Sequence, residues 1–179
     1  AASSTTRRLC LAAIALTRGQ RLVAKEMVIA GGDDDDLAAA LRDRAVALGI
    51  GARVEFAGPV DGLRKRQLLH GALALLMPSL SENFGNSALE AMAEGTPVIV
   101  APQVGIADSV MESGSGFVVA PDAAAFADAV RQLRDDGDLR ARMGERAREM
   151  VAATFSWSAI GARMENEYHA FVNDFRRSG

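Results

Sequence analysis

The strongest constraint on the fold is a regular alternation of strand-like and helix-like segments between residues 26 and 120. Short runs rich in apolar and β-branched residues, most of them closed by glycine or proline, predict five buried strands at residues 26–30, 53–57, 72–77, 97–101 and 116–120. Between them, helical patterns occur at residues 37–48, 63–71, 86–94 and 107–112. Strands that alternate with helices build βαβ units. The sequence therefore predicts an α/β fold, a doubly wound parallel sheet with helices on both faces.

The two ends of the chain depart from this alternation. After Pro121, three helical stretches follow one another without a strand, at residues 123–134, 139–152 and 156–175. We expect Asp138 and Ser156 to cap the second and third of these helices. At the other end, residues 9–25 have a helical pattern, so the strand that normally opens a doubly wound sheet is missing. We therefore expect residues 1–179 to form a single domain that is a fragment of a larger protein.

Composition limits the class of protein. Hydrophobic residues make up 49% of the chain and charged residues 24%, which is typical of a globular domain. The formal net charge of −3 argues against a nucleic-acid-binding surface. A lone cysteine, Cys10, excludes an intrachain disulfide, and His70 and His169 lie too far apart in sequence to suggest a metal site. Without a signal-peptide pattern or an apolar run of about 20 residues, the expected localisation is cytoplasmic.

Open parallel sheets bind ligands beyond the carboxyl ends of their strands. The loop at residues 78–85 lies at such an end, is polar, and leads into the helix predicted at 86–94. Because the first amides of a helix have no partner within it, the helix N-terminus after Gly85 can bind a phosphate. Glu82 precedes this helix and Glu90 lies within it, so one carboxylate can flank each side of the anion. Carboxylates accept hydrogen bonds from vicinal hydroxyls, so the loop predicts a site for a sugar–phosphate–ribose ligand.

The residues around these two acids resemble a known family. Glu82 and Glu90 are separated by seven residues within the segment SENFGNSALEAMAEGTPVI. This segment resembles the E-x7-E motif of retaining glycosyltransferases of family 4, which have the two-domain GT-B fold. The similarity continues in GPVDGLRKRQLLHGALALLMPS before the motif, in the glycine-rich residues 114–122, and in the aromatic segment FSW at residues 155–157. It extends over residues 27–172, nearly the whole chain.

The resemblance implies that the chain is the nucleotide-sugar-binding, C-terminal domain of a transferase with a Rossmann-like fold. Such an enzyme transfers a sugar from a UDP-, GDP- or ADP-sugar to an acceptor with retention of configuration, and no metal or other cofactor is expected. Helix dipoles and positive side chains would stabilise the leaving nucleoside diphosphate. Glu82 would be the catalytic residue, binding hydroxyls of the transferred sugar and stabilising its developing positive charge. Glu90 would bind the ribose hydroxyls.

The resemblance also implies further contacts with the donor. The amides of Phe84, Gly85 and Asn86 would face the sugar and phosphates. Ser87 would lie near the diphosphate, and Gly58 and Val60 would lie near the base. In the family, an arginine and a lysine after the first strand grip the phosphates. Arg7 falls about where this lysine would be, with Arg8 beside it, and Asp108 stands where the family has a glutamate after the fourth strand.

The family's N-terminal domain, which binds the acceptor, is missing from this sequence. We therefore expect the isolated chain to be inactive, with the helix at residues 156–175 packing toward that domain. The acceptor, whether a glycan, a lipid-linked molecule or a small molecule, would be held there, and any peripheral membrane contact would also be made by that domain. No nucleic-acid partner is expected.

Other interpretations stand beside this one. A nucleotide-sugar epimerase of the same fold, or a non-catalytic nucleotide-sugar-binding module, would share the donor site. The acidic run at residues 33–36 is more typical of a helix N-terminus than of a metal site, and the basic run at residues 64–66 is typical of a solvated helix face. Gly31 and Gly32 could approach a ligand. The sequence lacks the glycine motifs of dinucleotide-binding dehydrogenases, P-loop NTPases and α/β-hydrolases.

Overall fold

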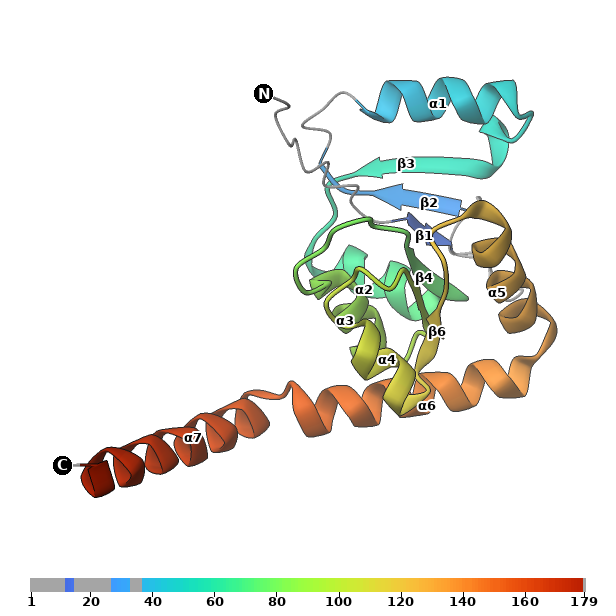
Figure 1. The fold of residues 1–179 in the computed structure, drawn as a ribbon. Helices are drawn as coiled ribbons and strands as arrows, with labels where there is room; N and C mark the ends of the chain where they lie inside the picture. Colours follow the sequence, from blue (N-terminus) through green and yellow to red (C-terminus); the bar gives the residue numbers. More distant parts are fainter. Residues whose placement is uncertain (1–11, 15–26, 33–36, 179) are drawn as a thin grey trace.

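A six-stranded sheet in the order β3-β2-β1-β4-β5-β6 forms the centre of the fold (Figure 1). The computed structural model describes residues 12–14, 27–32 and 37–178. The strands are β1 (Ala12–Ile14), β2 (Met27–Ala30), β3 (Val54–Gly58), β4 (Ala74–Met77), β5 (Val98–Val100) and β6 (Gly116–Val118). β2 pairs parallel with β3, and β5 pairs parallel with both β4 and β6. The predicted α/β class and its five predicted strands are confirmed.

Helices cover both faces of this sheet. They are α1 (Leu37–Ala47), α2 (Gly62–Gly71), α3 (Asn86–Ala93), α4 (Ala107–Ser113), α5 (Ala123–Asp135), α6 (Gly137–Thr154) and α7 (Trp157–Ser178), with a short 3-10 turn, η1 (Gly51–Arg53), before β3. Figure 1 shows α3 and α4 on one side of the strands and α5 on the other. Leu75 and Met77 of β4 pack with buried residues of α3 and α4, whereas Leu76 packs with those of α5. Because both of its faces are buried, β4 is continuously apolar.

The short strand β1 corrects the expectations that residues 9–25 form a helix and that the sheet lacks an opening strand. Ala12–Ile14 lies between β2 and β4 and pairs antiparallel with both. The backbone groups at the edges of these two strands are costly to leave unpaired inside a sheet. Periodicity alone does not separate a short apolar strand from a helix, and this tertiary pairing decides. The rest of residues 9–25, like Arg7, Arg8 and residues 33–36, lies outside the described residues.

The helical C-terminus is confirmed, with one correction. Ser156 caps α7, since its Oγ accepts a hydrogen bond of 3.2 Å from the amide of Ala159. The cap of α6 is Asp136 and not Asp138, because the helix begins earlier than predicted and the Asp136 carboxylate accepts a hydrogen bond of 2.8 Å from the Leu139 amide. Figure 1 shows α7 running away from the sheet beyond α6. Across the described segments, no helix is both long and apolar enough to span a membrane.

Helix α6 crosses the end of α3 at very short range. A Cβ built on Gly144 of α6 would lie 2.3 Å from the carbonyl oxygen of Gly95, which follows α3. One turn later, the Arg148 guanidinium donates a hydrogen bond of 3.3 Å to the carbonyl of Glu94. The close approach therefore depends on the missing side chain at position 144 and fixes the end of the helix that follows the β4 loop.

We predict that Gly144→Ala lowers the free energy of unfolding by about 1–3 kcal/mol, because the added methyl group forces α6 away from the Gly95 carbonyl. Chemical denaturation followed by circular dichroism measures the loss. Gly161→Ala in α7 is the matched control, since nothing lies within 4 Å of the Cβ it would add. Alanine should be favoured there by up to about 1 kcal/mol. Equal stability of the two variants would contradict the close packing.

Candidate functional site

The loop between β4 and α3 is fastened to the loop that follows β5. The amide of Glu82 donates a hydrogen bond of 3.4 Å to the Gln103 carbonyl, and the amide of Gly105 donates one of 2.9 Å to the Glu82 carbonyl. Glu82 and Val104 thereby form an isolated parallel bridge between the two loops. These bonds hold the main chain of Glu82 at the carboxyl edge of the sheet, where β4 and β5 both end.

Gly85 starts helix α3 and fits its place for two reasons. Its φ of 95° lies in the left-handed region, which residues with a side chain rarely adopt. A Cβ at this position would also lie 2.9 Å from Val104 Cγ1 and 3.4 Å from Met77 Sδ. The glycine thus lets α3 start directly against the ends of β4 and the β5 loop. The helix begins at Asn86, and the amides of its first turn have no partner within the helix.

The two acidic residues expected to flank this helix N-terminus have different surroundings. Glu82 is half-buried in the fastened loop. Glu90 lies further along α3, with 46% of its side chain exposed, and forms an ion pair with Lys65 of α2. The carboxylate of Glu90 is therefore directed toward α2. Glu82 thus lies in the loop before α3, beside the β5 loop, whereas Glu90 lies on α3 beside α2.

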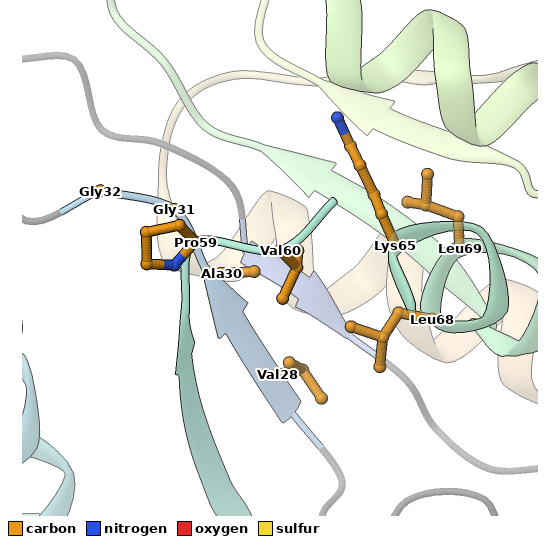
Figure 2. Close-up of a pocket in the computed structure, with 9 residues that line it drawn as sticks. All are labelled: Val28, Ala30, Gly31, Gly32, Pro59, Val60, Lys65, Leu68 and Leu69. Atoms are coloured by element: carbon orange, nitrogen blue, oxygen red, sulfur yellow. The ribbon is translucent and has the colours of Figure 1, made fainter. Parts of the chain in front are cut away.

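A cavity of about 240 Å³ opens at the carboxyl ends of β2 and β3 (Figure 2). Its mostly apolar wall comes from β2, the loop after β3, and α2: Val28, Ala30, Gly31, Gly32, Pro59, Val60, Lys65, Leu68 and Leu69. The amide of Gly31 donates a hydrogen bond of 2.9 Å to the carbonyl of Gly58, which ties the loops after β2 and β3 together. Of the two residues expected near a base, Val60 lines the cavity and Gly58 is bonded to its wall.

Lys65 is a residue of this site that the sequence pattern did not reveal. The basic run at residues 64–66 predicts a solvated helix face, and its two arginines are indeed 63% and 71% exposed. The prediction is wrong for Lys65, which is 27% exposed, lines the cavity and pairs with the acid of α3. The spacing contains the signal, because Lys65, Leu68 and Leu69 lie at i, i+3 and i+4 on one face of α2.

The remaining predicted residues lie around the same loop or outside the described chain. The ring of Phe84 packs edge-on against Phe155, with centroids 5.5 Å apart and an angle of 76° between the rings. Phe155 follows the end of α6, so the loop contacts the junction between α6 and α7. Asp108 is exposed in the first turn of α4. The phosphate contact of Arg7 stays a prediction, and the described residues contain no cluster of three or more candidate metal ligands.

An open sheet whose carboxyl edge presents a helix N-terminus, two acids and an apolar cavity defines a ligand-binding α/β domain. Residues 8–150 match the family described as Glycosyl transferases group 1. The chain belongs to this family. The match confirms the resemblance seen in the sequence, that to family 4 glycosyltransferases.

Two curated relatives illustrate the relationship. The chain is 37% identical over 138 residues to the D-inositol 3-phosphate glycosyltransferase of Streptomyces coelicolor. The aligned region covers 76% of this chain and 30% of that protein. It is 41% identical over 130 residues to D-inositol 3-phosphate glycosyltransferase 2 of Catenulispora acidiphila, covering 72% of this chain and 30% of that one. The chain thus spans less than a third of the length of these relatives.

Solved structures share the fold. Sucrose-phosphate synthase from Thermosynechococcus elongatus superposes with a TM-score of 0.70 at 30% identity, over 82% of this chain and 38% of that chain. Anabaena HepE in complex with UDP-glucose gives a TM-score of 0.71 at 22% identity, over 80% and 40%. The C-terminal domain of the Francisella tularensis protein LpcC gives 0.60 at 22% identity, over 69% and 65%. These likenesses confirm the expected fold, that of the C-terminal domain of a GT-B glycosyltransferase.

We predict that Gly85→Ala lowers the free energy of unfolding by about 2–4 kcal/mol, because it adds a methyl group both to a left-handed backbone and against Val104. Gly58→Ala is the matched control: its φ of 66° is also left-handed, but no atom lies within 4 Å of the added Cβ. That variant should lose only the backbone contribution of about 1–2 kcal/mol. Denaturant unfolding compares them, and a Gly85 variant as stable as the Gly58 variant would refute the steric argument.

Proposed function

We propose that the chain is the donor-binding domain of a retaining glycosyltransferase, which transfers a sugar from a nucleoside-diphosphate sugar to an acceptor. The observation that carries the proposal is the row of features along the carboxyl edge of the sheet: the apolar cavity, Glu90, the start of α3, and Glu82. These features match, in order, a base, a ribose, a diphosphate and a sugar. The Anabaena relative of this fold is described with UDP and with UDP-glucose, so uridine nucleotides are the first donors to test.

The cavity suits the base of the donor. Its volume of about 240 Å³ is below the roughly 300–1,000 Å³ of sites that enclose a whole drug-sized ligand, so it fits one fragment of the donor. Apolar side chains such as Val28 and Leu68 would cover the flat faces of a ring, and the backbone at Gly58 and Val60 would supply hydrogen bonds. Glu90 would then accept hydrogen bonds from the two ribose hydroxyls.

The start of α3 suits the diphosphate. Negative charge grows on the leaving nucleoside diphosphate as the sugar departs, and the amides of the first helical turn, with the helix dipole, stabilise such charge. The hydrogen bonds between Glu82 and the β5 loop hold these amides in place before the nucleotide sugar binds. In this proposal Glu82 faces the transferred sugar, binds its hydroxyls and stabilises its developing positive charge.

Activity in this proposal requires an N-terminal domain, which would hold the acceptor and against which α7 would pack. The support is a row of exposed large apolar side chains on α7: Trp157, Met164, Tyr168, Phe171 and Phe175. Their spacings of seven, four, three and four residues place them on one face of the helix. Exposed aromatic rows of this kind are typical of surfaces that pack against another protein surface.

We predict that at least one of UDP, GDP and ADP binds the chain in isothermal titration calorimetry. Glu90→Gln should weaken that binding about tenfold or more, because charged hydrogen bonds to the ribose, worth about 1.5–3 kcal/mol, become neutral ones. Glu145→Gln, on the exposed side of α6, is the control and should bind as the wild type does. If no nucleotide binds the chain, or if Glu90→Gln binds the nucleotide as tightly as Glu145→Gln does, the assignment of the donor site is refuted. Product analysis of protein that includes an N-terminal domain then separates transfer from epimerisation.

We predict that the double substitution Phe171→Ser and Phe175→Ser leaves the Tm of the 179-residue chain unchanged, because both side chains are exposed. In protein that includes an N-terminal domain, the same substitutions should lower the Tm and the transfer rate, since they remove apolar area from the proposed domain contact. Differential scanning calorimetry on both forms provides the comparison. An unchanged Tm in the longer protein would argue that α7 does not pack on that domain.

A further inference from the structure

Lys65 occupies a position unlike that of its two basic neighbours. On α2 it shares a face with Leu68 and Leu69, and all three line the cavity (Figure 2). Figure 2 shows its side chain leaving the helix with the nitrogen directed away from these apolar side chains. The neighbouring Arg64 and Arg66 are largely exposed and pair with other acids. Lys65 therefore contributes its aliphatic stem to the cavity and its charge to something beyond the cavity.

The group that receives this charge is Glu90. The Lys65 ammonium forms an ion pair with Glu90 Oε2, which links α2 to α3 at the edge of the cavity. A carboxylate has about four lone-pair positions on its two oxygens, so a bond from lysine leaves acceptors for hydroxyl groups. A second contact also links the two helices, because the buried hydroxyl of Thr96, which follows α3, donates a hydrogen bond to the carbonyl of Leu69 in α2. The ion pair thus sits on a fixed frame.

An ion pair this exposed contributes little to folding stability. Its effect is local, because an unpaired glutamate on an open helix face samples several side-chain rotamers and a ligand must select one of them. With the lysine in place, the carboxylate is already held against α2, the helix that supplies one wall of the cavity.

We propose that Lys65 is a positioning residue of the donor site, which holds the Glu90 carboxylate in the orientation that accepts the two ribose hydroxyls. This inference rests on the proposed function, since it assumes that a nucleoside diphosphate occupies the site. The ammonium acts through Glu90, so its effect depends on the 2′-hydroxyl of the ligand. A lysine that only gripped the phosphates would act equally on ribose and deoxyribose nucleotides.

The test compares a nucleoside diphosphate with its 2′-deoxy counterpart, using whichever of UDP, GDP and ADP binds the wild-type chain tightest. Calorimetry gives the ratio of the two Kd values for the wild type and for Lys65→Met, Lys65→Arg, Glu90→Gln and the neighbouring control Arg66→Met. We expect the wild type and Arg66→Met to prefer the ribose form about tenfold. Lys65→Met should bring the ratio close to one by weakening the ribose form, and Lys65→Arg should restore part of the preference. The double variant Lys65→Met, Glu90→Gln should lose no more of the preference for the ribose form than Glu90→Gln alone.

The outcomes separate the inference from the proposed function. If Lys65→Met keeps the wild-type ratio, or weakens both nucleotides equally, the positioning role is overturned while the donor site stands. If the wild type binds no nucleotide, or does not distinguish ribose from deoxyribose, the assignment of Glu90 is overturned and the inference falls with it. The Tm of each variant should match that of the wild type within the error of the measurement. An unchanged Tm shows that a lost preference for the ribose form does not reflect misfolding.

Discussion

The contact between the loops after β4 and β5 is the constraint on which the candidate site depends. Two glycines make it possible: Gly85 starts α3 against Val104, and a Cβ on Gly105 would lie 2.1 Å from the carbonyl oxygen of Asn83. The hydrogen bonds between Glu82 and the β5 loop then hold the two loops together. Where α3 begins, and therefore where its first amides lie, follows from this contact. The geometry of the site is thus set largely by positions that have no side chain.

Much of this fold could be predicted because its information is local. β4 and β5 are buried on both faces, so their sequences are continuously apolar and easy to recognise. The polar loop that follows β4, with Gly85 before a helical pattern, marks the start of α3 equally well. The spacing of Glu82 and Glu90 also lies within one short segment, so the row from loop to helix is visible before any tertiary contact is known.

The features that escaped prediction depend on partners far away in the sequence. Ala12–Ile14 becomes a strand because β2 and β4 offer it backbone partners on both sides. Lys65 looks like part of a solvated basic run until α3 brings Glu90 beside it. Phe84 finds its ring contact at Phe155, after the end of α6. In each case the local pattern is ambiguous, and the packing of two distant elements decides which interpretation is correct.

Helix α3 divides stability and binding between its two faces. Ala88, Ala91 and Met92 are fully buried and fix the helix in the core with α4 and α6. Glu90 lies on the open side, where an ion pair adds little to the free energy of folding but sets the direction of a carboxylate. Changes on the open face can therefore alter ligand recognition without unfolding the domain, whereas changes on the buried face move the helix N-terminus and Glu90 together. This separation is what allows stability and binding to be measured as independent properties of one short helix.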